Sequence, residues 1–166
     1  MTRAVRFGAL ILTIAAIGAL AQPVQILAVE TRDENAIVCR RVDRGSTVTL
    51  VFTHSMYGGE VRETWRVDGD SLDRVRIVTD NAAAAEYYAT DGRIRRVGGG
   101  FEVIVPPARI DRLPFRIDHI GNHRLRFDGE DISLAHGIDG SAGADLTPSQ
   151  TPLIAWLVNA NAGCER

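Results

Sequence analysis

The sequence contains no lysine, so all 19 of its basic residues are arginines. This absence excludes Schiff-base chemistry and a Walker-type phosphate site, because both depend on a lysine side chain. Aromatic residues make up only 6% of the chain, and there are only two cysteines, Cys39 and Cys164. In an oxidising compartment these two could form a disulfide that ties the C-terminal tail to an early strand, whereas no motif supports a reactive thiol.

Long apolar runs are also scarce, and the one that is present lies at the N-terminus. Two arginines precede it, and the segment at 19–21, Ala-Leu-Ala, fits the small-x-small rule for signal peptidase. We therefore interpret residues 1–21 as an export signal and residues 22–166 as a single extracytoplasmic domain, periplasmic or secreted. The alternative is an uncleaved membrane anchor, which Pro23 and Gln25 disfavour because they interrupt the apolar run.

Charge and periodicity narrow the class of the predicted domain. It has 17 arginines against 21 acidic residues, and this net negative charge argues against nucleic-acid binding. Short alternating segments separated by turn signals are typical of a mainly β protein, either an antiparallel sandwich or a small barrel. The segments expected to be strands are 24–32, 36–42, 47–54, 60–67, 73–79, 93–97, 101–106, 123–128 and 130–136. The alanine-rich run at 81–93 predicts one short helical turn.

The pattern changes towards the C-terminus. The stretch at 135–149 is rich in Gly, Asp and Ser, which predicts a loop. After it, Thr151 suits a helix N-cap, Pro152 suits the first helical position and Gly163 suits the end of the helix. We expect one C-terminal helix that packs across the open end of the sheet.

The stretch at 47–67 predicts a β-hairpin in which polar residues share the apolar face. A two-residue turn at 58–59, both Gly, tolerates positive φ angles, and closing the hairpin there places His54 opposite Glu63. We therefore predict an inward-facing His54–Glu63 pair at the edge of the core. If this pair exists, replacing Glu63 by Gln should mainly reduce stability.

The four histidines all fall on apolar faces if the segments that contain them are strands. Zinc accepts imidazole and carboxylate ligands, so His54, Glu63, His123 and His136 are candidate zinc ligands if the strand ends converge. The simpler interpretation, which we favour, is that each histidine caps a strand end through a hydrogen bond. A catalytic role for Ser55 beside His54 is disfavoured, because Ser55 alternates to the opposite face of the strand.

The sequence THSMYGGEVRETWRV at 53–67 resembles the His-Ser-Val, then Pro-Val-x-Glu signature of small exported proteins catalogued as domain of unknown function family 1850. Four residues of the signature carry over directly: His54, Ser55, Val61 and Glu63. The stretch at 120–135 is similar to the closing strands of that family. Members are often encoded beside TAXI-type TRAP transporters, so the resemblance implies an accessory role in solute uptake, and no activity is established for the family.

These observations lead to the hypothesis of a non-enzymatic domain that binds a TRAP receptor or permease, or a small solute, without a cofactor. The candidate binding residues are His54, Ser55, Arg62, Glu63 and Arg66. The two arginines lie on the face opposite the pair and offer charge to an anionic partner. The alternative is a metal-dependent or acid–base hydrolase that uses the region around His54 and Glu63.

Overall fold

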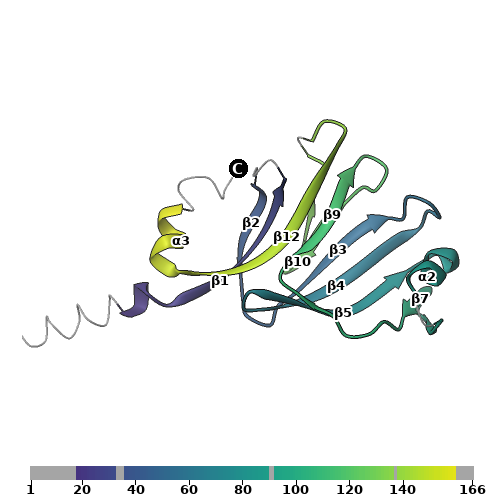
Figure 1. The fold of residues 1–166 in the computed structure, drawn as a ribbon, viewed down its shortest axis with the longest axis horizontal. Helices are drawn as coiled ribbons and strands as arrows, with labels where there is room; N and C mark the ends of the chain where they lie inside the picture. The colour runs from purple at the N-terminus through teal and green to yellow at the C-terminus, as the bar shows by residue number, and fades with distance from the viewer. Residues whose placement is uncertain (1–17, 33–35, 90–91, 137, 160–166) are drawn as a thin grey trace, which may run out of the picture.

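The computed structural model describes most of the chain, namely residues 18–32, 36–89, 92–136 and 138–159. Antiparallel strands dominate it and form two separate sheets. Figure 1 shows α2 (Ala82–Tyr88) at the end of the larger sheet and α3 (Leu153–Asn159) beside β1, at opposite ends of the molecule. The prediction of an antiparallel β-sandwich with one C-terminal helix is confirmed, and the small barrel is not formed by the described strands.

The smaller sheet has four strands in the spatial order β2–β1–β12–β9. Their bounds are Ala36–Val42 for β2, Pro23–Thr31 for β1, Ser141–Pro152 for β12 and Leu113–Asp118 for β9. The larger sheet has the order β11–β10–β3–β4–β5–β7–β6, and β8 also pairs with β5. Its strands are β3 (Thr47–Thr53), β4 (Glu60–Asp68), β5 (Ser71–Thr79), β6 (Ile94–Val97), β7 (Gly100–Val103), β8 (Arg109–Ile110), β10 (Arg124–Phe127) and β11 (Glu130–Ser133).

The longest strand, β12, corrects the prediction of a loop at 135–149. From Ser141 onwards this stretch pairs with β1 on one side and with β9 on the other. Ala144, Leu146 and Pro148 alternate towards the core and are buried. The Gly, Asp and Ser residues of the surrounding stretch obscured this period-2 pattern in the sequence, but a central strand paired on both sides tolerates poor intrinsic strand formers.

The C-terminal helix also begins later than predicted. Thr151 and Pro152 pair with the start of β1, so they belong to β12 and do not cap the helix. Helix α3 therefore begins at Leu153, whose N–H donates to the carbonyl of Gln22 at 2.9 Å. Rather than closing the open end of the sheet, α3 packs on an apolar cluster formed by Val24, Ile26 and Cys39. The predicted end at Gly163 lies outside the described residues.

One hydrophobic cluster fills the space between the two sheets. It includes Leu27 of β1, Leu50 of β3, Trp65 of β4, Ile117 of β9 and Leu146 of β12, all of which are fully or almost fully buried. A second cluster lies under α2, and its buried members are Val61, Ile77, Ala85 and Val103. The large sheet therefore has two apolar regions on its inward face, and β4 and β5 contribute to both.

The β3–β4 hairpin has a different register from the one predicted. Leu50 lies opposite Glu63, and Thr53 opposite Glu60, so the connecting loop at 54–59 is longer than a two-residue turn. The predicted His54–Glu63 pair is therefore wrong. The shift along β4 is an even number of residues, so the same side chains still point inward. His54 is buried, with 6% of its surface exposed.

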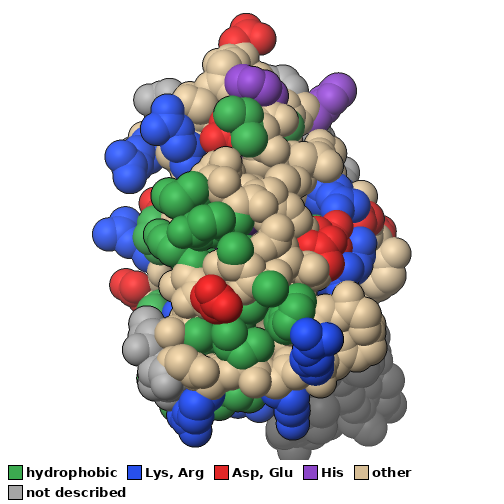
Figure 2. Space-filling view, turned by 90° about the vertical axis from the view of Figure 1, so that its right-hand side faces the viewer, with side chains coloured by type: hydrophobic (Ala, Val, Ile, Leu, Met, Phe, Trp, Pro, Cys, Tyr) green, Lys and Arg blue, Asp and Glu red, His purple; other side chains and the backbone are tan. Residues whose placement is uncertain are grey.

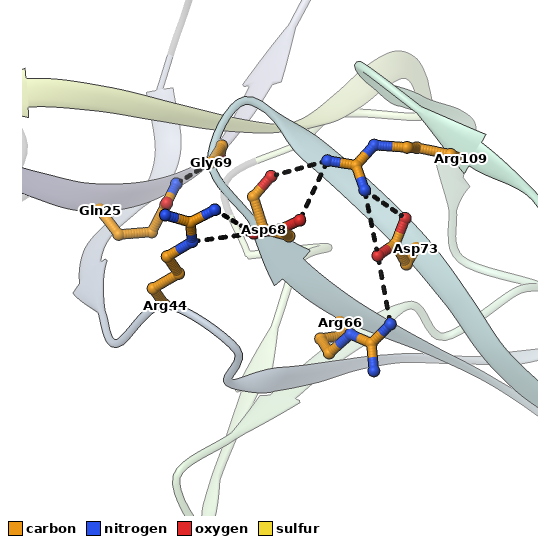
Figure 3. A network of polar contacts seen from close by, with 7 residues as sticks. All are labelled: Gln25, Arg44, Arg66, Asp68, Gly69, Asp73 and Arg109. Carbon is orange, nitrogen blue, oxygen red and sulfur yellow. Dashed lines mark hydrogen bonds and ion pairs between the residues drawn. The ribbon is translucent and has the colours of Figure 1, made fainter.

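Polar contacts tie the β4–β5 turn to the rest of the molecule (Figure 3). Gln25 of β1 donates to the carbonyl of Gly69 at 2.7 Å, which links the two sheets. Asp68 accepts from Arg44 at 2.8 Å and from Arg109 at 3.0 Å. These two arginines hold the pKa of the Asp68 carboxyl below its usual range, with Arg44 the larger influence. The network lies at the β4–β5 turn, at the end of β5 opposite to the one that leads into α2.

Candidate functional site

The turn after β3 is organised by His54. The Nδ1 atom of its ring accepts hydrogen bonds from the backbone N–H groups of Met56 and Tyr57, at 3.2 and 3.3 Å. Nδ1 must be unprotonated to accept them, so Nε2 carries the ring proton. The backbone of His54 also pairs with Gly58 and Gly59 at 2.8 and 3.0 Å. For His54, the prediction that a histidine caps a strand end is confirmed.

Three tyrosines surround the His54 ring. Tyr57 comes from the same turn, and Tyr87 and Tyr88 come from the last turn of α2. Their ring centroids lie 5.1, 5.0 and 5.8 Å from that of His54. We call His54 and these three tyrosines the aromatic cluster. It joins the hairpin turn to helix α2.

Asn81 fixes the same two elements from the other side. Its Oδ1 atom accepts from the N–H groups of Ala83 and Ala84 at 2.8 and 3.1 Å, which caps the N-terminus of α2. Its Nδ2 atom donates to the carbonyl of Tyr57 at 3.0 Å. The backbone of Gly59 lies so close to Asn81 that a Cβ added at position 59 would be 2.4 Å from the Asn81 Cβ. The φ of Gly59, +78°, also favours glycine. The turn and the helix are therefore held as one unit.

This unit presents apolar side chains to solvent. Met56 is 69% exposed, Tyr57 42% and Tyr87 59%. We call these three residues the tip surface. Figure 2 views the end of the molecule that carries α2 and shows hydrophobic side chains gathered in the middle of this face, with arginines around them. Exposed large apolar groups held in one place are typical of an interaction surface.

A second feature lies inside the large sheet and centres on Glu63. Its neighbours on the inward face of β4, Val61 and Trp65, are both fully buried. Burial raises the pKa of the Glu63 carboxyl, and the Arg74 guanidinium and the Trp65 indole oppose this rise only in part. Within the described part of the chain, Arg74 forms no ion pair with Glu63. The carboxyl group therefore lies mostly buried, near the Arg74 guanidinium but outside ion-pair distance of it.

The buried Nε–H group of Arg74 has no hydrogen-bond partner among the described residues, whereas the Trp65 indole N–H faces the Glu63 carboxyl without reaching good hydrogen-bond geometry. The Arg74 guanidinium lies over the Trp65 ring, with its Cζ atom 5.0 Å from the ring centroid. A buried donor without a partner costs about 1–3 kcal/mol. Tyr88 completes the group, because burial, and after it the charge of Glu63, raises the pKa of its hydroxyl. We call Glu63, Trp65, Arg74 and Tyr88 the polar cluster.

Two surface cavities lie elsewhere on the molecule. One, of about 380 Å³, lies at the turn formed by residues 96–101. The other, of about 670 Å³, lies at β1, β9 and β12, and its walls carry both charges, including those of Glu30, Arg112 and Asp145. Neither is lined by a residue of the tip surface or of the polar cluster. The polar cluster is thus an interior feature rather than a part of either cavity.

The histidines divide into two groups. His54 and His123 are buried, whereas His119 and His136 are exposed. The prediction that all four lie on apolar faces required strands at these positions, and His119 and His136 lie in turns beyond the ends of β9 and β11. Among the residues that the structure describes, no group of three or more His, Cys, Asp or Glu side chains could hold a metal ion. The candidate zinc ligands, Glu63 with three of these histidines, are therefore not brought together.

The remaining predicted residues lie apart from both clusters. Arg62 and Arg66 are exposed on the outer face of the large sheet, as expected, and each forms an ion pair with a carboxylate, of Glu60 and Asp73 respectively. Cys39 is buried in β2. Cys164 lies outside the described residues, so a disulfide between the two stays a prediction.

Most of the predicted export signal, residues 1–17, also lies outside the described residues, so the export signal stays a prediction. No helix within the described ranges is long and apolar enough to cross a membrane.

The model of one protein family, a domain of unknown function designated DUF1850, matches residues 48–134. The chain belongs to this family. The DUF1850 region runs from the second residue of β3 to just beyond β11, so it contains the tip surface, the aromatic cluster and the polar cluster. No curated protein and no solved structure is significantly similar to the chain.

Sequence reasoning found Glu63 but missed Arg74 as its neighbour. The reason is a bulge in β5: Trp65 lies opposite Arg74 while Thr64 lies opposite Arg76, so Val75 is an extra residue. The bulge moves the inward row of β5 from even to odd numbers. A strict alternation along 73–79 therefore gives no sign that Arg74 shares a face with a core residue such as Ile77. The position of Arg74 next to Trp65 and Glu63 therefore follows only from the register between β4 and β5.

Proposed function

We propose that this chain is a non-enzymatic, extracytoplasmic accessory domain that binds a protein of a TRAP-type transporter, its receptor or its permease, through the tip surface. The observation that carries the proposal is the exposure of Met56, Tyr57 and Tyr87 on a turn and helix that are fastened together. Tyrosine and methionine are enriched in protein interfaces, and a few such residues supply most of the binding energy.

Preorganisation supports a binding role for this surface. Two contacts fix the conformation of the turn in the free protein. The ring of His54 accepts a hydrogen bond from the turn backbone, and the side-chain amide of Asn81 donates one to the carbonyl of Tyr57. A surface that is already ordered loses little conformational entropy on association. The family signature at His54 thus builds the turn that presents the tip surface.

Two further observations favour binding over hydrolysis and point to the class of partner. Ser55 is exposed while His54 is buried with Nδ1 occupied by backbone donors, so the two side chains are not arranged as nucleophile and base. The N-terminal export pattern, and the transporter genes that often accompany members of the family, support a partner among the transporter proteins of the cell envelope.

The test is a crosslinking pull-down of tagged full-length protein from its native envelope. The double variant Tyr57→Ala/Tyr87→Ala removes most of the tip surface. The matched control is Ile154→Ala/Val158→Ala, which removes exposed apolar side chains from α3, at the other end of the molecule. Truncating an interface hot spot costs more than about 1 kcal/mol, so recovery of a TRAP receptor or permease should fall at least about tenfold for the tip variant.

The control variant should recover the transporter protein as well as the wild type does. Equal recovery with the tip variant would move the interface away from this surface. Failure of the wild type to recover any TRAP protein would contradict the proposed partner.

A further inference from the structure

The outer face of the smaller sheet carries the larger of the two surface cavities. Helix α3 packs on this face over Val24, Ile26 and Cys39. Glu30 shares the face with Val24 and Ile26, because side chains alternate along β1, and it lines the cavity of about 670 Å³ together with residues of β9 and β12. Sites for small molecules commonly measure about 300–1,000 Å³. We call this feature the outer-face cavity, and it is large enough for a small solute.

Two carboxylates stand side by side in the outer-face cavity. Glu30 of β1 lies directly opposite Asp145 of β12, so both side chains project from the same face of the sheet. Like charges placed directly opposite each other on paired strands are destabilising. Glu30 forms no ion pair with a described residue, and the guanidinium of Arg112 approaches the Asp145 carboxylate only to 4.0 Å. A cationic group bound between the two carboxylates would relieve their repulsion.

Two arginines flank this acidic pair. Arg112 comes directly before β9 and Arg32 directly after β1, and these strand ends lie on opposite sides of Asp145 along β12. The side chain of Arg32 lies against β12, because Gly143 leaves room for it: a Cβ added at position 143 would be 2.8 Å from the Arg32 Nε. No carboxylate of the described residues pairs with Arg32, and 65% of the Arg112 side chain is exposed. Both guanidinium groups can therefore donate to an anionic group in the cavity.

The charges of the outer-face cavity select among classes of ligand. A purely cationic ligand would leave the two arginines without a counter-charge, and a purely anionic one would be repelled by the two carboxylates. We propose that the cavity binds a free amino acid in its zwitterionic form. The ammonium group binds between Glu30 and Asp145, and the carboxylate accepts hydrogen bonds from Arg32, with Arg112 at the other side of the acidic pair. This site is separate from the tip surface and does not depend on the proposed partner.

Amide chemical shifts of the full-length, ¹⁵N-labelled protein test this proposal, with Gly143 and Asp145 as the reporters in the cavity. The probes are L-alanine, its methyl ester, which lacks the carboxylate, and N-acetylalanine, which lacks the ammonium group. Titrations are made in low salt, because salt screens exposed charges, and at about pH 6.5, where the α-amino group is protonated. We expect a saturable shift of both reporters with L-alanine. Each analogue should bind about fivefold more weakly, which is the most that an exposed ion pair contributes.

Two substitutions assign the two ends of the ligand. Arg32→Met should weaken L-alanine about fivefold and leave the methyl ester unchanged, whereas Glu30→Gln should weaken both, because both carry the ammonium group. Arg76→Met is the matched control, an exposed arginine of the larger sheet that also has no ion pair with a described residue, and it should change nothing. The dispersion of the amide spectrum checks that each variant folds. Equal binding of L-alanine and either analogue, unchanged binding in both cavity variants, or no saturable shift at the two reporters overturns the proposal.

Discussion

Replacing Glu63 by Gln tests whether the polar cluster weakens the fold. A His54–Glu63 pair would make this change destabilising, but Glu63 lies opposite Leu50, and burial raises the pKa of its carboxyl. The charged form is thus less favourable in the folded protein than in the unfolded chain. We therefore expect Glu63→Gln to stabilise the protein at neutral pH, the opposite of what the sequence alone predicts.

The size of the gain depends on pH. Below the ordinary glutamate pKa of about 4.3, the carboxyl is protonated in both states and the variant gains nothing. As the pH rises through the raised folded-state pKa, the wild type loses stability, because ionisation is easier in the unfolded chain. Each unit of pKa corresponds to about 1.4 kcal/mol. For Glu63 we therefore expect a gain at pH 7 that is absent at low pH, and a gain of about 1 kcal/mol would raise the Tm by about 2–4 °C.

Urea unfolding at pH 4 and pH 7 measures this difference directly. Glu60→Gln is the matched control with the opposite sign. Burial raises the pKa of Glu60, but Arg62 and Arg124 together outweigh it and hold that pKa below its usual value. The control should therefore lose stability at pH 7 and approach the wild type as the pH falls. A loss of stability for Glu63→Gln at pH 7, or an equal gain at both pH values, refutes the reasoning.

Two further substitutions test the packing around α2. Asn81→Ala removes the N-cap of α2 and the hydrogen bond to the Tyr57 carbonyl, which together stabilise the fold by about 2 kcal/mol, so the urea midpoint should fall. Asn81→Asp keeps the cap and loses only the bond to Tyr57, so it should restore about half of the lost stability. Equal midpoints for the two variants would argue against a stabilising bond between Asn81 and Tyr57. Gly100→Ala would place a Cβ 2.6 Å from the Thr79 carbonyl oxygen, so it should lower the Tm. Gly98→Ala is the control, because its added Cβ would meet no atom within 4 Å and should leave the Tm unchanged. Equal Tm values for the two variants would contradict the close approach of Gly100 to Thr79.

The hairpin shows what a sequence pattern can and cannot determine. Alternation correctly placed His54 and Glu63 on the inward face, because the side-chain period of a strand is two residues whatever the register. The register itself depended on which residues form the turn. Gly58 and Gly59 both have positive φ, as a tight turn requires, but the ring of His54 stabilises a wider loop by bonding to two backbone N–H groups. Sequence spacing does not reveal that side-chain cap.

Strand β12 shows a different limit. Its residues have low intrinsic preference for strands, and the alternation of Ala144, Leu146 and Pro148 is weak because one member is small and one is proline. What makes the segment a strand is pairing with β1 and β9 on both sides, a tertiary effect that overrides local preference. By contrast, β2 was predicted with its bounds, because its short apolar run, rich in β-branched residues, is bounded by charged and turn residues.

Position 63 carries a carboxyl where the hydrophobic core would favour an apolar side chain. Val61 and Trp65, its neighbours on the inward face, are apolar in character and fully buried, so an apolar residue at 63 would join two hydrophobic clusters into one core. The chain instead has a carboxyl there, with Arg74 beside it. Sites that break the local rule of a core are typical of positions selected for binding.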